Sequence, residues 1–261
     1  MPEGDTIHRS AARLHDALAG KLVRGFRAPR LEGERPHVGA TIEAVEAVGK
    51  HLLVRFADGL TLQTHMMMSG SWHLYRPRER WQRPAHMARV VIEVDDWVAV
   101  CFLAPVVRSY REGGRHSPID HLGVDLCRAD ADVDLAVQRA TLLSSPDAQI
   151  AEVLLDQRIA CGVGNVYKSE TLFACRVNPF TPLRDLDAVA RRSLFATAAR
   201  LLQANLHDAA RTTVATGGLA VYGRARRPCL VCGTPIERRS HGQSMRITYW
   251  CPRCQPETVR C

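Results

Sequence analysis

The stretch Cys229-Leu230-Val231-Cys232 and its counterpart Cys251-Pro252-Arg253-Cys254 are separated by 18 residues near the end of the chain. Each Cys-x-x-Cys pair fits a turn that presents two thiolates to one ion, and four sulfurs in a tetrahedron favour zinc. Four cysteines with this spacing are an improbable product of unrelated core packing. Because a site closed by four cysteines leaves no open position for water, we expect one structural zinc ion and no catalytic metal. The sequence therefore predicts a zinc finger, built as a β-hairpin, over residues 223–261.

The predicted zinc segment is strongly basic. Its arginines outnumber its carboxylates, Glu237 and Glu257, by four to one; they are Arg224, Arg226, Arg227, Arg238, Arg239, Arg246, Arg253 and Arg260. A zinc-clamped hairpin covered with arginine suits the phosphate backbone or a groove of a nucleic acid. The alternative is a zinc ribbon that only fastens a small tail, with its arginines on a solvated face.

The whole chain shares this positive charge. Its 261 residues carry a net charge of +8 with a sequence pI of about 9.2. Arginine dominates over lysine, and its planar fork makes two hydrogen bonds to a phosphate at once. The charge therefore suggests a polyanionic partner. A genome of high GC content would also enrich arginine, so the composition alone leaves both explanations open.

Composition also indicates the class of protein. Hydrophobic residues make up 46% and charged residues 24%, which is typical of a globular chain long enough for two domains. No apolar run approaches the ~20 residues of a membrane helix, and no signal-peptide core opens the chain. We expect a cytoplasmic protein without disulfides. Four cysteines lie singly in apolar surroundings and are interpreted as buried hydrophobes: Cys101, Cys127, Cys161 and Cys175.

The region before the zinc segment has helical periodicity. Helices are predicted over 135–143, 150–156, 166–174 and 186–206, which gives an all-α domain over 135–222 after a hinge at 119–134. The Gly-rich turn Cys161-Gly162-Val163-Gly164-Asn165 opens the third helix. Such a turn offers backbone N–H groups and a positive dipole end to a phosphate, although tight turns also use glycine without any ligand.

Residues 1–118 show a different pattern, with short alternating runs separated by turns such as Asp58-Gly59. Strands are predicted over 22–26, 41–48, 51–56, 60–64, 72–75, 88–94 and 98–103. A helix is predicted over 5–19, with Asp5 as its cap and Gly20 as its stop. The predicted fold class is therefore α+β: an N-terminal antiparallel β-sandwich opened by a helix, then the helical domain and the zinc hairpin.

Pro2 and Glu3 open the chain. Removal of Met1, which a small second residue permits, would expose a secondary α-amine with a pKa of about 7.7–8.0, partly neutral and nucleophilic near pH 7. Its condensation with a sugar aldehyde gives an iminium that has no N–H proton to lose and that acidifies the adjacent carbon. Glu3 is placed to act as general acid. On these two residues alone, an ordinary chain start with a surface carboxylate is the simpler interpretation.

Several stretches, taken together and in order, resemble the formamidopyrimidine-DNA glycosylase / endonuclease VIII family of DNA repair enzymes. Besides Pro2-Glu3, the matching stretches are Val48-Gly49-Lys50-His51-Leu52-Leu53, His65-Met66-Met67-Met68-Ser69-Gly70, Gly162-Val163-Gly164-Asn165-Val166-Tyr167-Lys168-Ser169-Glu170 and Arg246-Ile247-Thr248-Tyr249-Trp250-Cys251-Pro252-Arg253-Cys254-Gln255. The resemblance covers nearly the whole chain. It implies a β-sandwich joined by a hinge to a helix-two-turns-helix domain with a zinc finger, and damaged DNA lying between the two domains.

The resemblance also implies an activity, that of a DNA glycosylase and AP lyase of base excision repair that needs no NAD, ATP or catalytic metal. Pro2 resembles the family's nucleophile at the anomeric carbon, and Glu3 the acid that opens the sugar ring. Lys50 resembles the lysine that contacts the phosphate beside the lesion and assists catalysis. The resemblance implies three further DNA contacts: Asn165 and Arg246 to phosphate, and Met68 in the gap left by the extruded base. Without it, Lys50 would be an exposed strand lysine and Met68 part of the core.

Two departures from the family pattern bear on the substrate. Thr6 occupies the position where the family usually has a second glutamate, with Asp5 one residue away. The region Leu103-Ala104-Pro105-Val106-Val107-Arg108 lacks the Asp-Pro-Arg-Arg-Phe-Gly loop of the formamidopyrimidine branch. Together with Gly4, this favours the endonuclease VIII branch and oxidised pyrimidines. Oxidised purines, lesions in bubbles or single strands, and a non-catalytic zinc-ribbon DNA-binding protein of the same fold are the alternatives.

Overall fold

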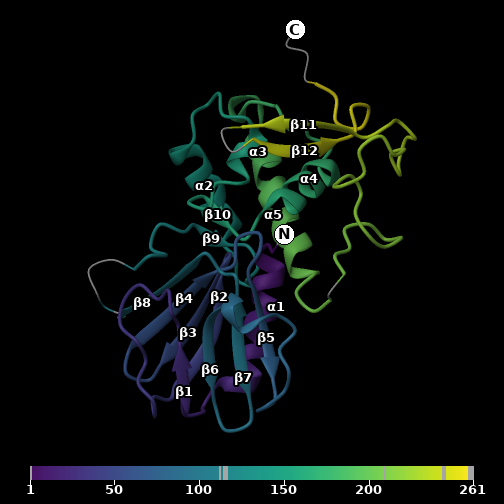
Figure 1. Ribbon diagram of the computed structural model, residues 1–261. Helices are drawn as coiled ribbons and strands as arrows, with labels where there is room; N and C mark the ends of the chain where they lie inside the picture. Colours follow the sequence, from purple (N-terminus) through teal and green to yellow (C-terminus); the bar gives the residue numbers. More distant parts are fainter. Residues whose placement is uncertain (1, 112, 114–116, 209, 243–244, 258–261) are drawn as a thin grey trace. The chain divides into compact units, whose positions relative to one another are not determined.

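The computed structural model describes residues 2–111, 113, 117–208, 210–242 and 245–257 (Figure 1). The chain forms two compact units, Met1–Asp120 and His121–Cys261. The boundary between them falls inside the segment 119–134, where the sequence predicts a hinge. Met1, and Arg260 of the predicted arginine cluster, lie outside the described residues. No helix in the described part of the chain is long and apolar enough to cross a membrane.

Helix α1 (Gly4–Leu18) opens the first unit. Its apolar residues recur at three- and four-residue spacing and are all buried: Ile7, Ala11, Leu14 and Leu18. The prediction that Asp5 caps this helix is wrong, because the helix starts one residue earlier. Glu3 is the N-cap, and its carbonyl oxygen accepts the N–H groups of Thr6 (3.0 Å) and Ile7 (3.1 Å). Gly20 follows the helix at φ +76°, a conformation that glycine adopts without strain, so it ends the helix as predicted.

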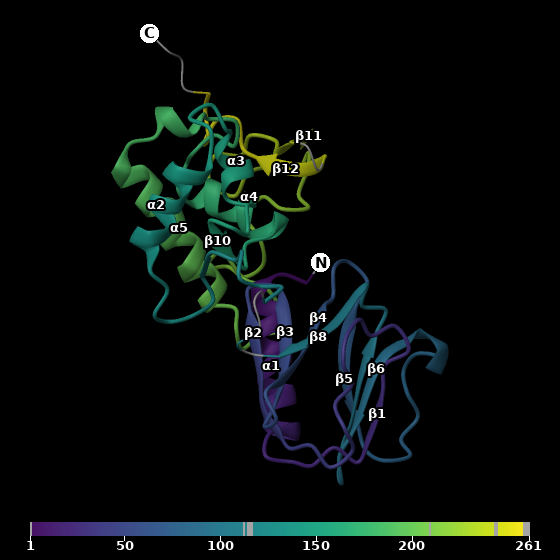
Figure 2. The ribbon, with the colours of Figure 1, turned by 90° about the vertical axis from the view of Figure 1, so that its left-hand side faces the viewer.

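Two four-stranded antiparallel sheets follow and form the kind of sandwich that the sequence predicts. The first has the order β1-β6-β7-β5: β1 (Gly25–Arg27), β6 (Ala88–Glu93), β7 (Val98–Phe102) and β5 (Ser71–Tyr75). The second has the order β2-β3-β4-β8: β2 (Ile42–Val48), β3 (His51–Phe56), β4 (Leu60–His65) and β8 (Val106–Arg111). Figure 2 shows the two sheets facing each other, with α1 running along the second sheet. This is the predicted β-sandwich opened by a helix.

Alternate strand residues fill the space between the sheets. Val54 of β3, Ile92 of β6 and Cys101 of β7 belong to one buried cluster, which also contains the apolar face of α1. Successive side chains of a strand point to opposite faces, so the intervening residues of the first sheet form a second cluster on its outer face. Phe102 and Tyr75 belong to that outer cluster. Both faces of the first sheet are therefore covered.

Strand β8 is not predicted by the sequence. It pairs with β4 along its whole length, from Val106 opposite His65 to Arg111 opposite Leu60. Arg108 and Arg111 obscure its alternation, and their side chains form ion pairs with Glu32 (2.9 Å) and Glu34 (2.6 Å). Charged side chains are typical of an edge strand, where they oppose pairing with a second sheet. An edge strand of this kind carries a weak hydrophobic signal.

In the described part of the second unit, four α-helices appear where helices are predicted. They are α2 (Val133–Leu143), α3 (Ile150–Val153), α4 (Asn165–Ala174) and α5 (Ala188–Gln203). Helix α5 begins later than predicted because the Asp187 carboxylate caps it, accepting the Ala190 N–H at 2.7 Å. Helix α3 is shorter than predicted. The chain turns after it at Asp156, whose carboxylate accepts the Arg158 N–H at 3.0 Å.

Three small strand elements complete this unit, together with one strand in the predicted hinge. There β9 (Val124–Asp125) pairs in parallel with β10 (Ala160–Cys161), so part of the hinge segment is ordered by a partner 36 residues away. The C-terminal hairpin is β11 (Glu237–His241) paired antiparallel with β12 (Arg246–Trp250). The hairpin is predicted by the sequence. The short 3₁₀ turns η1 (Ala85–Met87) and η2 (Leu183–Asp185) lie in the first and second units.

Candidate functional site

The four predicted metal ligands come together beside the hairpin. The Sγ atoms of Cys229, Cys232, Cys251 and Cys254 all lie within 4.8 Å of one another. Two of the separations are 3.9 Å (Cys229–Cys254) and 3.5 Å (Cys232–Cys251). Four sulfurs around a tetrahedral ion at about 2.3 Å are about 3.8 Å apart, so this spacing fits a closed metal site. The backbone N–H groups of Val231 and Cys254 donate to Cys229 Sγ (3.4 Å) and Cys251 Sγ (3.5 Å).

Gln255 fastens this cysteine cluster to the helical part of the unit. Its side chain is fully buried, accepts the Cys251 N–H at 3.0 Å and donates to the Val177 carbonyl at 2.8 Å. The Asn178 amide donates in turn to the Gln255 carbonyl at 2.9 Å. The second cysteine pair is thereby fixed to the loop after α4. Sequence reasoning quoted Gln255 only as the end of a matching stretch.

Asn165, a predicted phosphate contact, is the first residue of α4 and is 5% exposed. Its Nδ2 donates to the Ile247 carbonyl on β12 at 2.7 Å, and its Oδ1 accepts Lys168 Nζ at 2.6 Å. Lys168 is fully buried and also donates to Thr248 Oγ1 at 2.8 Å. The Asn165 amide thus joins the Gly-rich turn to the hairpin. A role toward phosphate would rest on the small exposed part of this amide or on the helix N-terminus around it.

Glu170, on the same helix, organises the segment that follows α5. Its carboxylate accepts three consecutive backbone N–H groups, those of Ala220 (2.8 Å), Val221 (2.9 Å) and Tyr222 (2.8 Å), and the hydroxyl of Thr213. Bonds from backbone N–H groups to a buried carboxylate are charge-assisted and strong. Glu170 and Lys168 are therefore functional residues of the scaffold that sequence reasoning missed. Both lie inside the quoted stretch that begins at Gly162, and the available signal was that they are the only charged residues of α4.

Arg246 begins β12 and is half-buried, with the exposed Met245 and Ile247 on either side. Other arginines of the predicted cluster serve the fold. Arg239 stacks on Phe180, with its Cζ 3.6 Å from the ring centroid, and Arg224 donates to the Pro228 carbonyl at 3.0 Å. Arg246 has no side-chain hydrogen bond or ion pair to any residue that the structure describes, so its guanidinium is available to a ligand.

At the other predicted centre, in the first unit, Pro2 is partly exposed and Glu3 and Asp5 are fully buried. Glu3 caps α1 through its backbone, so the helix fixes where Pro2 and the Glu3 side chain begin. Thr6 Oγ1 lies 3.3 Å from Asp5 Oδ1 and donates to it. The structure thus brings two buried carboxylates next to the chain start. Asp5 is the nearest carboxylate in sequence to the position that Thr6 occupies.

Lys50 lies in the two-residue turn between β2 and β3, directly before β3, which agrees with its expected place at the start of that strand. Gly49 has φ +56°, and Val48 pairs with His51 across the turn, so the hairpin uses its glycine at the first central position. His51 stacks on His65 at 4.6 Å, and its Nδ1 lies 2.7 Å from Gln63 Nε2. Burial, and secondarily the charge of Lys50, lower the pKa of His65. Lys50 and His65 are therefore electrostatically coupled.

Met68 lies at the tip of the turn between β4 and β5 and is 68% exposed. Met66, by contrast, is buried in the sandwich core. The turn is tight: the Gly70 N–H donates to the Met66 carbonyl at 2.8 Å, and a Cβ on Gly70 would approach Met66 within 2.7 Å. The turn therefore buries Met66 and exposes Met68 to solvent. An exposed apolar side chain on a tight turn suits a wedge better than a core position.

Comparison with known proteins matches both units. Residues 1–105 match the model of the formamidopyrimidine-DNA glycosylase N-terminal domain, and residues 122–216 match the model of the formamidopyrimidine-DNA glycosylase H2TH domain. The chain belongs to the formamidopyrimidine-DNA glycosylase / endonuclease VIII family. Family membership confirms the resemblance noted in the sequence. Pro2, Glu3, Lys50 and Met68 lie in the first matched domain and Asn165 in the second, whereas Arg246 and the four cysteines lie beyond both.

Several relatives similar to this chain are named for endonuclease VIII or for an AP lyase. The chain is 42% identical to "Probable endonuclease 8 2" of Streptomyces coelicolor, over 98% of this chain and 94% of that protein. It is 35% identical to "DNA-(apurinic or apyrimidinic site) lyase Nei2" of Mycolicibacterium smegmatis, over 98% and 99%. The structure of the MutM (Fpg) protein from Thermus thermophilus matches with a TM-score of 0.80 and 26% identity, over 99% and 100%. The chain is thus endonuclease VIII-like within its family.

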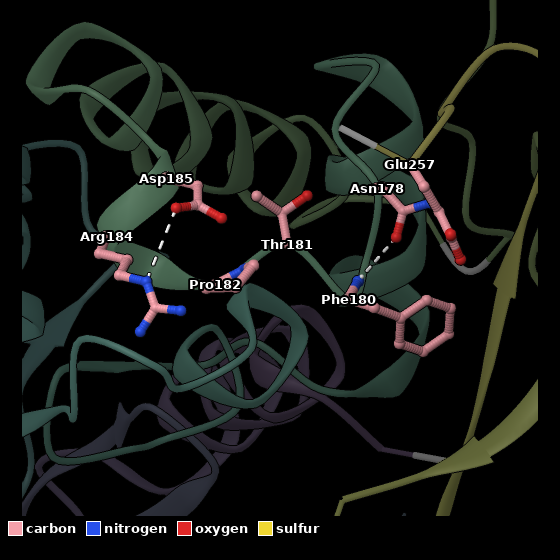
Figure 3. Close-up of a pocket in the computed structure, with 7 residues that line it drawn as sticks. All are labelled: Asn178, Phe180, Thr181, Pro182, Arg184, Asp185 and Glu257. Atoms are coloured by element: carbon pink, nitrogen blue, oxygen red, sulfur yellow. Dashed lines mark hydrogen bonds and ion pairs between the residues drawn. The ribbon is translucent and has the colours of Figure 1, made fainter. Parts of the chain in front are cut away.

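A hollow of about 350 Å³ lies in the second unit beside the hairpin (Figure 3). Its charged and polar groups bond mainly to each other: the Phe180 N–H donates to Asn178 Oδ1 at 2.9 Å, and Arg184 forms ion pairs with Asp147 and Asp185. Phe180 is covered by Arg239 and packs edge-on against Trp250 at 5.0 Å. The hollow therefore results from the packing of the hairpin against the loop after α4, and we assign it no ligand.

Proposed function

We propose that this family member is a bifunctional DNA glycosylase and AP lyase of base excision repair that acts through Pro2. The observation that carries the proposal is the arrangement at the chain start, where a partly exposed proline directly precedes the buried Glu3 at the N-cap of α1. The relatives in the endonuclease VIII branch support the activity by their names. Damaged DNA is the proposed partner, and the protein works as a monomer in the cytoplasm, associated with the nucleoid.

The chemistry starts after Met1 is removed. The Pro2 nitrogen bonds to the anomeric carbon of the damaged nucleotide, the bond from that carbon to the base breaks, and the base leaves with a proton. The ring oxygen takes up a second proton as the sugar opens, which leaves a charged iminium. Loss of the adjacent carbon's proton expels the 3′ phosphate, and a second elimination expels the 5′ phosphate. Water then releases the sugar remnant and restores the free amine.

Glu3 and Lys50 assist these steps. Glu3 is the proposed acid that protonates the ring oxygen, and its burial keeps the carboxyl away from competing water. Lys50, presented by the tight turn between β2 and β3, is proposed to contact the phosphate beside the lesion. The proposed steps use only side chains, the terminal amine and water.

The remaining proposed contacts hold the distorted DNA. Flipping a nucleotide out of the duplex costs a few kcal/mol, and filling the gap recovers part of that cost. The exposed Met68 is the proposed filler. Arg246, with its guanidinium available, and the N-terminus of α4 at Asn165 are proposed to hold phosphates of the kinked strand. The Asn165 side chain has its main partners inside the protein, so its share of this binding is small.

We propose a single zinc ion at the four cysteines, in a structural role. The donor set is four thiolates at tetrahedral spacing, which suits zinc and leaves no position for water. The ion would hold Cys229 and Cys232 against the pair that Gln255 fixes to the helical part. It takes no part in the reaction.

Oxidised pyrimidines are the proposed substrates. Gly4, the absence of an Asp-Pro-Arg-Arg-Phe-Gly loop before β8 and the similarity to proteins named endonuclease 8 support this choice. Oxidised purines are the alternative. A panel of duplexes, each with one lesion, tests the two: faster cleavage of 8-oxoguanine than of thymine glycol would contradict the pyrimidine preference.

The activity itself is tested by trapping. Sodium borohydride should reduce the iminium and leave a covalent protein–DNA adduct on an abasic or thymine-glycol oligonucleotide. Mass spectrometry first establishes that Met1 is absent from the protein used. A matched preparation with one residue added before Pro2 should form no adduct and cut no strand. Equal nicking by both preparations would eliminate the Pro2 mechanism.

The replacement of the family's second glutamate by Thr6 favours one rival function, a non-catalytic DNA-binding protein of the same fold. The buried Asp5 beside Thr6 supports the enzyme, because it supplies a second carboxylate near Pro2. Binding of lesion DNA without any adduct or cleavage by protein lacking Met1 would support the rival. Asp5→Asn should reduce cleavage strongly if Asp5 stands in for the glutamate.

A further inference from the structure

The segment 76–87 connects β5 to β6 across the outer face of its sheet (Figure 2). Both strands pair antiparallel with β7, which lies between them, so the connection must return along the sheet from one end to the other. The outer face beneath it carries Tyr75, Val100 and Phe102, in a cluster separate from the sandwich core. The segment therefore lies on an apolar surface that is separate from the sandwich core.

Trp81 is the anchor of this segment. Its ring stacks on Tyr75 at 6.2 Å and meets Phe102 edge-on at 5.9 Å, and Arg27 lies over it at 6.0 Å. The indole is only partly buried, and its remaining surface borders an open hollow of about 380 Å³, lined also by Glu79, Arg83 and Ala85. The flat ring of an unpaired base could contact the part of the indole that Tyr75, Phe102 and Arg27 leave uncovered.

The charge around Trp81 is positive and largely uncompensated. Arg78, Arg80 and Arg83 form no ion pair within 4.0 Å in the described part of the chain, unlike the paired arginines elsewhere in this unit: Arg24, Arg55, Arg108 and Arg111. The one carboxylate of the segment, on Glu79, accepts the Arg76 N–H at 2.7 Å. His73 adds aromatic surface next to Tyr75 and Phe102. Burial, then Arg83 and Arg13, lower its pKa, which favours the neutral ring near pH 7.

We propose that Arg78, Arg80, Trp81 and Arg83 form a second nucleic-acid site, the crossover site, which binds a single-stranded stretch. Arginines that lack ion-pair partners among the described residues would hold successive phosphates, and the exposed part of the indole would stack on an unpaired base. A duplex hides its bases in the stack, so of the two forms of DNA only a single strand uses both features. An acidic protein or an anionic membrane could use the charge and the indole as well, so both are outcomes that the test distinguishes. This site goes beyond the proposed lesion chemistry and does not depend on it.

The test uses the full chain and a lesion-free, fluorescein-labelled oligothymidylate. Its length is about 15 nucleotides, the upper end of the site size of one single-strand-binding module. Fluorescence anisotropy measures the affinity of the protein for this oligonucleotide at several salt concentrations. The triple variant R78Q/R80Q/R83Q should bind it at least ~10-fold more weakly. The slope of log K against log salt should fall by about two, since each phosphate contact with a single strand contributes about 0.7. The matched control R24Q/R55Q/R111Q removes the same charge from ion-paired positions and should bind like the unmodified protein.

Trp81→Phe separates stacking from charge while keeping an aromatic ring on Tyr75 and Phe102. It should weaken binding of the oligothymidylate roughly threefold and leave unchanged the binding of an equally long strand of tetrahydrofuran residues, which lack both a base and an aldehyde that Pro2 could attack. Thermal melting checks that each variant is folded. Unchanged affinity and salt slope for the oligothymidylate in R78Q/R80Q/R83Q would overturn the crossover site. The same conclusion would follow if this variant bound anionic vesicles, an acidic protein or duplex DNA more weakly but kept its affinity for the oligothymidylate. Borohydride trapping is measured in parallel: its failure in every protein would count against the Pro2 mechanism and leave this result standing.

Discussion

Lys168 on α4 donates a hydrogen bond from its Nζ to Thr248 Oγ1 on β12 at 2.8 Å, and both residues are fully buried. The same ammonium group donates to Asn165 Oδ1 at 2.6 Å. Burying an ammonium group without such partners would cost folding free energy. The two hydrogen bonds therefore fix the position of the hairpin against the Gly-rich turn. One lysine thereby connects two of the stretches that identify the family.

Lys168→Met should lower the free energy of unfolding by about 2–4 kcal/mol, because the methionine fills the space but leaves Asn165 Oδ1 and Thr248 Oγ1 without their donor. Urea unfolding followed by circular dichroism measures the change. The control Lys21→Met removes a partly exposed partner of Asp96, and its effect should be much smaller because exposed ion pairs add little to stability. Equal urea midpoints for the two variants would refute the role given to Lys168.

Glu170→Gln should loosen the segment 212–222, because the neutral amide cannot accept three backbone N–H groups as a carboxylate does. We expect a loss of about 2 kcal/mol in unfolding free energy. Limited proteolysis should cut this segment sooner than in the unmodified protein. Glu46→Gln, which disturbs a surface ion pair with Arg55, provides the control. Unchanged proteolysis in Glu170→Gln would mean that the carboxylate is dispensable.

Cys232→Ser should release the proposed zinc and unfold the last forty or so residues, since binding and folding of such sites are coupled. Atomic emission measures zinc per chain, and near-ultraviolet circular dichroism reports on Trp250 and Tyr249. Cys175→Ser, a substitution outside the cysteine cluster, should keep one zinc per chain. Full zinc content in Cys232→Ser would exclude the four-cysteine site.

Arg246→Ala should weaken binding to duplex DNA evenly across sequences. If the guanidinium holds one phosphate, the slope of log K against log salt should fall by about 0.9. Titrations between low and moderate salt give the slope. Arg128→Ala removes an arginine already paired with Asp130 and serves as the control, with an unchanged slope expected. An unchanged salt slope in Arg246→Ala, as in the control, would contradict a phosphate contact by Arg246.

Lys50→Gln should raise the pKa of His65, because the lysine's charge is the second cause of its depression. Burial, the first cause, remains, so the pKa should stay below about 6.5. Folding lowers this pKa, so His65 costs stability as the pH falls below about 6.5, and that cost should be smaller in Lys50→Gln. Histidine resonances followed by NMR give the pKa. An identical value in both proteins would show that Lys50 does not act on His65.

Much of the fold was available from the sequence because its signals are local. Alternation over His51–Phe56 and three-to-four spacing over α1 follow from the geometry of strand and helix, and they predicted both elements closely. The weak points were equally local. Asp5 resembles a cap by residue type, yet the helix starts at Gly4, and the ion-paired arginines of β8 hid an edge strand.

By itself the sequence determined the sandwich, the helices, the cysteine spacing and the order of the family's stretches, because each is encoded within a few neighbouring residues. Only the tertiary structure decided which side chains are engaged and which are available. Lys168 reaches Thr248 and Glu170 reaches Ala220, pairings that join residues 50 to 80 positions apart, while Arg78 and Arg80 have no carboxylate partner among the described residues. Such long-range pairings depend on how the folded elements pack, and no local pattern specifies them.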